Sequence, residues 1–136
     1  MLLKRGANPN DMDRLRVTPI MLSGKYNRPE AAEVLLKAGV NVNAKGREGM
    51  AAIHYAAQNG GIEVIKVLLN YGANVNQPGT DRKTPLMFAA SAGNYELCEF
   101  LIENKARTTS KDKCRRTPLI WAVRNGWTHV VSLLLQ

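Results

Sequence analysis

Apolar and small residues return at the same positions every 33 residues along this chain of 136 residues. A four-residue slot begins at residues 18, 51, 84 and 117, and it reads TPIM, AAIH, TPLM and TPLI. A pair of aliphatic residues follows later in each period, as Leu35-Leu36, Leu68-Leu69, Leu101-Ile102 and Leu134-Leu135. A fixed period of this length is typical of a stacked-repeat architecture, in which each unit is one supersecondary element.

Each four-residue slot predicts the start of a helix. The threonine at positions 18, 84 and 117 is a good helix N-cap because its hydroxyl can accept a backbone N–H, and the proline after it fits the first helical position. Gly60, Gly93 and Gly126 then predict the end of this helix, since a left-handed glycine commonly follows a helix. The stretch around each aliphatic pair predicts a second helix, which Gly39 and Gly72 end. One period therefore predicts a helix, a turn, a second helix and a long loop.

With these motifs in place, the chain resembles the ankyrin-repeat family. The Thr-Pro start, the small pair Ala89-Ala90, the turn glycine, the aliphatic pair and the loop Ala73-Asn74-Val75-Asn76 match the family's pattern. The resemblance implies a mainly α fold, an ankyrin-repeat helical solenoid with β-hairpin-like finger loops. It implies one domain over 1–136, with repeats at about 11–43, 44–76, 77–109 and 110–136, and with 1–10 as the end of a preceding repeat. Since the chain stops inside a predicted helix, we expect it to be part of a longer chain.

Some positions depart from the family's pattern. Ala51 replaces the capping threonine in the second repeat, and losing such a cap typically costs about 1 kcal/mol, so we expect the helix after it to fray most readily. Asn27 and Lys105 stand where a turn glycine is expected. The resemblance also implies that His54 bridges to the next loop in a structural role.

Composition limits the classes of protein that need to be considered. No apolar run approaches the roughly 18–20 residues of a membrane span, and two cysteines do not form a disulfide framework. We expect Cys98 in the core and Cys114 as an exposed thiol, which fits the cytoplasm or the nucleus. No spacing resembles a metal site, and no nucleophile–base pair can be argued. We therefore expect a non-catalytic protein with no cofactor and no metal.

Charge adds information that the repeats do not carry. The net charge is +8. The resemblance implies that the finger loops and the exposed ends of the first helices form one surface, which we call the concave face. That face holds twelve basic and five acidic residues, which leaves +7 on it and +1 on the remainder. The basic residues are Arg14, Arg16, Lys25, Lys45, Arg47, Arg82, Lys83, Lys111, Lys113, Arg115, Arg116 and Arg124, and the acidic ones are Asp11, Asp13, Glu48, Asp81 and Asp112.

A column of large apolar residues is expected to cross the concave face. Leu22, Tyr55, Phe88 and Trp121 each follow the start of a slot by four positions. Aromatic residues flanked by arginine and lysine are typical anchors of protein interfaces. The candidate partner-binding residues are Arg47, Tyr55, Lys83, Phe88, Lys113, Arg116, Trp121 and Arg124.

Three functions stay open at this point. The first is a protein–protein interaction module, monomeric, that binds a partner with acidic character through the concave face. The second is a binder of nucleic acid or another polyanion, with Lys111, Lys113, Arg115 and Arg116 as a phosphate patch. The third is a passive scaffold segment of a larger protein, in which case the surface charges only keep the chain in solution.

Overall fold

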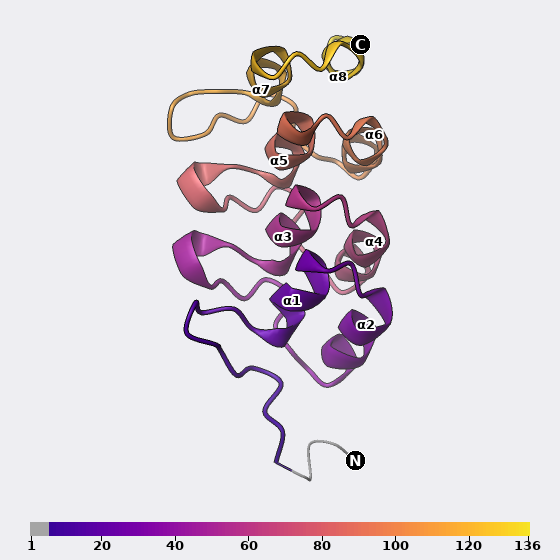
Figure 1. Ribbon diagram of the computed structural model, residues 1–136. Helices are drawn as coiled ribbons and strands as arrows, with labels where there is room; N and C mark the ends of the chain where they lie inside the picture. Colours follow the sequence, from indigo (N-terminus) through magenta and orange to yellow (C-terminus); the bar gives the residue numbers. More distant parts are fainter. Residues whose placement is uncertain (1–5) are drawn as a thin grey trace.

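The computed structural model describes residues 6–136, and in that part of the chain it contains eight α-helices and no strand. The helices form four consecutive antiparallel pairs that stack along one axis (Figure 1). The prediction of a mainly α repeat solenoid is confirmed. The helices are α1 (Pro19–Lys25), α2 (Pro29–Lys37), α3 (Ala52–Gln58), α4 (Ile62–Asn70), α5 (Pro85–Ala92), α6 (Tyr95–Glu103), α7 (Pro118–Arg124) and α8 (Thr128–Leu134).

The helices form two layers. In Figure 1, α1, α3, α5 and α7 stack in an inner column, and α2, α4, α6 and α8 stack in an outer column. The core forms where the two columns pack against each other and where successive repeats stack. It includes the fully buried side chains of Ile53, Ile65, Leu68 and Leu101. None of the helices in residues 6–136 has the length and apolar character that crossing a membrane requires.

The helix starts follow the predicted capping only in part. The Thr84 hydroxyl accepts the backbone N–H of Met87 at 3.4 Å, and the Thr117 hydroxyl accepts that of Ile120 at 3.3 Å. For Thr18 the prediction of a side-chain cap is wrong, because its buried hydroxyl has no hydrogen-bond partner in the described part of the chain. The sulfur of Met21 lies beside Thr18 and accepts its backbone N–H at 3.5 Å.

Small residues allow the inner helices to pack closely. Gly24 on α1 is buried against α3, and a Cβ added there would lie 2.5 Å from the carbonyl oxygen of Ala52. At the helix ends, Gly93 takes the left-handed conformation at φ 73°, as the sequence predicts. Asn27 and Lys105 take the same conformation at φ 52° and 76° without being glycine, so the turn survives both departures from the pattern. The Asn27 side chain also accepts the backbone N–H of Val64 at 3.2 Å, which ties its turn to the next repeat.

Finger loops project to one side of the inner helices (Figure 1). One backbone hydrogen bond closes each of them, for example from the Gly46 N–H to the Met50 carbonyl at 2.8 Å and from the Asp112 N–H to the Arg116 carbonyl at 3.0 Å. Short 3₁₀ turns at Arg47–Gly49 and Thr80–Arg82 form two of the tips. The fingers are thus tight turns that reverse the chain as a hairpin does, but no strand ladder forms in the described residues.

His54 connects the second repeat to the third. Its Nδ1 accepts the backbone N–H of Ala51 at 2.9 Å, so its Nε2 carries the proton and donates to the Gln77 carbonyl at 2.6 Å. The bridging role implied by the resemblance is therefore present. The bond to Ala51 satisfies the backbone N–H of the N-cap residue, whereas a threonine at position 51 would accept the N–H of residue 54.

Stability should depend on pH through His54. Burial lowers the pKa of the fully enclosed ring from its ordinary value of 6.5 and outweighs its hydrogen bonds to backbone groups. Because the folded pKa lies below the unfolded one, the stabilisation is complete above pH 6.5 and is lost as the pH falls through the folded pKa. Urea unfolding of the protein between pH 7.5 and pH 5 should show this loss. The His54→Met variant should show a much flatter profile, since methionine occupies the same column at positions 21 and 87. An equal pH dependence in both proteins would assign the effect to other groups.

Candidate functional site

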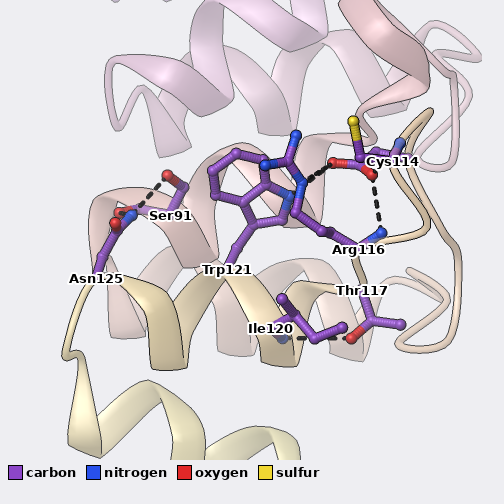
Figure 2. Close-up of polar contacts among 8 residues, drawn as sticks. Ser91, Cys114, Arg116, Thr117, Ile120, Trp121 and Asn125 are labelled. Atoms are coloured by element: carbon purple, nitrogen blue, oxygen red, sulfur yellow. Dashed lines mark hydrogen bonds and ion pairs between the residues drawn. The ribbon is translucent and has the colours of Figure 1, made fainter.

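Three cationic side chains surround one aromatic ring on the concave face. The Arg116 guanidinium carbon lies 4.3 Å from the centre of the Trp121 ring, the Lys83 ammonium nitrogen 4.7 Å and the Arg124 guanidinium carbon 5.5 Å. Figure 2 shows Arg116 extending across the indole of Trp121. We call these four residues the tryptophan cluster. Its members come from the finger before α5, the finger before α7, and α7 itself, so two adjacent repeats build it.

Asp112 fixes two members of the tryptophan cluster, Arg116 and Trp121, by hydrogen bonds. Its side chain is fully buried, and its Oδ2 accepts the Arg116 Nε–H at 3.1 Å and the Trp121 Nε1–H at 3.0 Å. Its Oδ1 accepts the backbone N–H groups of Cys114 at 2.9 Å and Arg116 at 2.8 Å. One carboxylate therefore folds the finger and also orients the two side chains at the centre of the cluster.

The hydrogen bonds keep Asp112 ionised. Burial by itself would raise the pKa of this carboxyl, but the bonds from the Arg116 backbone, the Trp121 indole, the Cys114 backbone and the Arg116 side chain outweigh burial and lower it. A buried carboxylate that receives several N–H donors is stabilised in its charged form. Asp112 is thus an anion at neutral pH that fixes the Arg116 side chain.

A shallow pocket lies beside the tryptophan cluster, between the second and third repeats. Its volume is about 280 Å³, and it is lined by Arg47, Glu48, Met50, Tyr55, Gln58, Thr80, Lys83 and Phe88. We call it the Tyr55–Phe88 pocket. Lys83 joins it to the tryptophan cluster, because its ammonium nitrogen is 5.8 Å from the Phe88 ring and 4.7 Å from the Trp121 ring.

The structure brings seven of the eight sequence-predicted residues into these two adjoining groups. Lys113 is different, since it is exposed on its finger and is a member of neither group. Its backbone N–H donates to the Asp81 carbonyl at 2.8 Å, which links the tips of two consecutive fingers. Leu22, the first residue of the predicted column of large apolar residues, lies outside both groups.

Sequence reasoning missed the role of Asp112 and counted it as one acidic residue among five. A signal was available. Positions 13, 46, 79 and 112 form one column, with aspartate in the first and last fingers and glycine in the two between them, as Asp13, Gly46, Gly79 and Asp112. Aspartate commonly accepts backbone N–H groups at turns, and Asp13 does so for Leu15 and Val17 at 2.9 Å each. The column therefore indicates which fingers are closed by a carboxylate, although not what else that carboxylate binds.

Metal-ligating side chains and thiols are the other groups in the described chain that could carry out chemistry. Within residues 6–136, no group of three or more His, Cys, Asp or Glu side chains is placed to hold a metal ion. Cys98 is buried and Cys114 is exposed, as predicted, and both are free thiols. Burial raises the pKa of the Cys98 thiol to about 12, which makes it a poor nucleophile.

Stacked helix pairs with fingers on one side define the class as a repeat solenoid that presents an open surface. The family model described as "Ankyrin repeats (3 copies)" matches residues 1–79 and 76–136, and the chain belongs to the ankyrin-repeat family. Ankyrin repeats are generally non-catalytic modules for protein–protein interaction. A search among curated proteins found no match to the chain.

Proposed function

We propose that this chain binds an acidic segment of a protein partner through its concave face, without catalysis. The observation that supports the proposal is the tryptophan cluster, in which Lys83, Arg116 and Arg124 gather around Trp121. Three positive charges at one ring repel one another, and an acidic ligand would relieve that repulsion. The full candidate set remains Arg47, Tyr55, Lys83, Phe88, Lys113, Arg116, Trp121 and Arg124.

The cluster has the character of an interface hot spot. Tryptophan, tyrosine and arginine are enriched among the few residues that dominate binding energy. Arg116 is already oriented by Asp112 and by the ring, with a quarter of its side chain exposed. A ligand therefore does not have to order this side chain, and this saves roughly 0.5–1.5 kcal/mol for each side chain that would otherwise be immobilised.

The distribution of charge favours the same face. The concave face carries +7 of the net charge of +8. A one-sided field of this kind steers association with an acidic partner and weakens as salt is added, because exposed charges are screened over about 8 Å at physiological ionic strength. We further propose a monomer located in the cytoplasm or the nucleus, in keeping with its free thiols.

A nucleic acid or another polyanion is the second candidate. Lys111, Lys113 and Arg115 are exposed on the finger that also carries Arg116, which gives the densest positive charge on the chain. Against this candidate, the cations over the Trp121 ring occupy the surface on which a base would stack. Base stacking on aromatic side chains is a principal source of affinity for single strands.

A pull-down from cell extract tests the proposal. The immobilised chain is compared with its Lys83→Glu/Arg116→Glu/Arg124→Glu variant, each at low and high salt. We expect discrete proteins to bind the unmodified chain, to elute with salt and to be absent from the variant. An eluate made of nucleic acid that nuclease removes would favour the polyanion instead. Binding that ignores the three substitutions would overturn the assigned site.

A further inference from the structure

We propose that the tryptophan cluster is a subsite for a phosphorylated side chain of the partner, that is, for a phosphate monoester dianion. The proposal rests on the proposed function and specifies the ligand at its centre. Lys83, Arg116 and Arg124 would bind the phosphate oxygens, while Trp121 would hold the three cations around it.

The charge of the cluster matches a dianion better than a carboxylate. Three cations lie around the ring, and Asp112 neutralises one of them through the Arg116 Nε–H. Two positive charges remain. A phosphorylated serine or threonine carries about −1.5 to −2 at neutral pH, whereas an aspartate or glutamate carries one charge. A single carboxylate would therefore leave one cation without a counter-charge.

The cluster is also compact enough for one group. Every cationic centre lies within 5.5 Å of the same ring centre, so one group bound beside the ring is close to all three side chains. Lys83 and Arg124 have flexible side chains that can move toward a bound group. Phosphate has three terminal oxygens and can accept from several donors at once, and arginine pairs with it through two parallel N–H bonds.

Arg116 is prepared for this role. Within the described chain, its side chain donates one hydrogen bond, through Nε to Asp112, and that leaves its terminal nitrogens for a ligand. The Asp112 carboxylate that accepts this bond is completely buried, so it does not face an incoming anion. The other acidic groups nearby are at the finger tips, where Glu48 accepts the Thr80 hydroxyl at 3.3 Å and Asp81 is exposed.

Fluorescence of Trp121 reports directly on the subsite. The background is Trp127→Phe, which leaves Trp121 as the single tryptophan. The probes are acetylated, amidated pentapeptides with the sequence Gly-Gly-X-Gly-Gly, in which X is phosphoserine, aspartate or serine, titrated at constant ionic strength. We expect the phosphoserine peptide to bind at least ten times more tightly than the aspartate peptide, and the serine peptide to leave the fluorescence unchanged.

Matched variants locate the effect. Lys83→Gln and Arg124→Gln should each weaken the phosphoserine peptide about tenfold, a loss of 1.4 kcal/mol. Lys66→Gln removes a cation that lies 5.7 Å from the Phe100 ring on the outer side, and it should leave the affinity unchanged. Both cluster substitutions are of side chains that do not enter the core, and circular dichroism confirms the fold of each variant.

The outcomes separate the two proposals. Equal affinity for the aspartate and phosphoserine peptides would overturn the phosphate subsite but leave an acidic docking site in place. Tighter binding of the dinucleotide thymidylyl-thymidine than of the phosphoserine peptide would replace it with a nucleic-acid site. If no acidic peptide changes the Trp121 signal and the triple glutamate variant still captures the same proteins, both proposals fail.

Discussion

Exchanging Lys83, Arg116 and Arg124 for glutamate should weaken binding of the acidic partner by at least about 100-fold, or roughly 3 kcal/mol at 1.4 kcal/mol for each factor of ten. The three side chains lie around one ring, so a ligand that reaches Trp121 meets all of them. Hydrogen bonds to charged groups contribute about 1.5–3 kcal/mol each. The glutamates add repulsion to that loss. Biolayer interferometry with the partner recovered by pull-down measures the change.

A second triple variant separates the site from net charge. Lys37, Lys66 and Arg107 lie outside the concave face, and their exchange for glutamate changes the net charge of the chain by the same amount. Long-range steering alone predicts a loss of a few-fold in the association rate, which salt removes. Equal loss of affinity in the two triple variants would show that only the overall charge matters. Because Arg116→Glu would also face the buried Asp112, the double variant Lys83→Glu/Arg124→Glu is measured beside them.

Asp112→Asn should weaken partner binding about tenfold, although it makes the chain more positive by one charge. The amide oxygen can still accept the backbone N–H groups of Cys114 and Arg116, so the finger keeps its turn. The amide NH₂ then faces the Arg116 Nε–H and the Trp121 Nε1–H, which lose their common acceptor. A buried donor left without an acceptor costs about 1–3 kcal/mol, and urea unfolding should show a loss of that size.

Asp13→Asn is the matched control for this substitution. Asp13 closes the first finger with the same pair of backbone bonds, but Leu22 stands there in place of the tryptophan. It should change neither partner affinity nor the stability of the last repeat. Tighter binding by Asp112→Asn would contradict the positioning role, because it would show that charge alone controls affinity.

Acid should reproduce the effect of Asp112→Asn on stability. The hydrogen bonds to Asp112 outweigh its burial and hold its pKa below the ordinary 3.8. The folded pKa is the lower one, so its stabilisation is present above pH 3.8 and is lost as the pH falls through the folded pKa. The substituted protein should lack this component of acid unfolding.

The sequence predicts the fold well because the same signals for helix starts and helix ends recur in each repeat. The slots at 18, 51, 84 and 117 each precede an inner helix, and Gly60, Gly93 and Gly126 each take positive φ after one. The prediction is wrong at Thr18, where capping depends on the position of a side chain and not on residue type alone. Residue type gives only a preference for capping, and the Met21 side chain packed beside Thr18 makes the hydrogen bond that the structure shows there.

The candidate site is less predictable because it depends on contacts between repeats. The column of Tyr55, Phe88 and Trp121 follows from periodicity, yet only Trp121 collects three cations, since Arg116 and Arg124 occur beside it and Lys83 reaches it from the preceding finger. The contact of Asp112 with Arg116 and Trp121 depends on the path of the backbone through the finger, and the spacing of residues in the sequence does not predict that path.

Hydrogen–deuterium exchange of the chain, with and without the salt-eluted partner, tests the central claim most directly. The claim is that the partner lies on the concave face across the tryptophan cluster and the Tyr55–Phe88 pocket. We predict slower exchange in the fingers before α5 and α7 and at the ends of α5 and α7, with α4 and α6 unchanged. Protection confined to the outer helices α4 and α6, with the fingers exchanging as in the free chain, would contradict the claim.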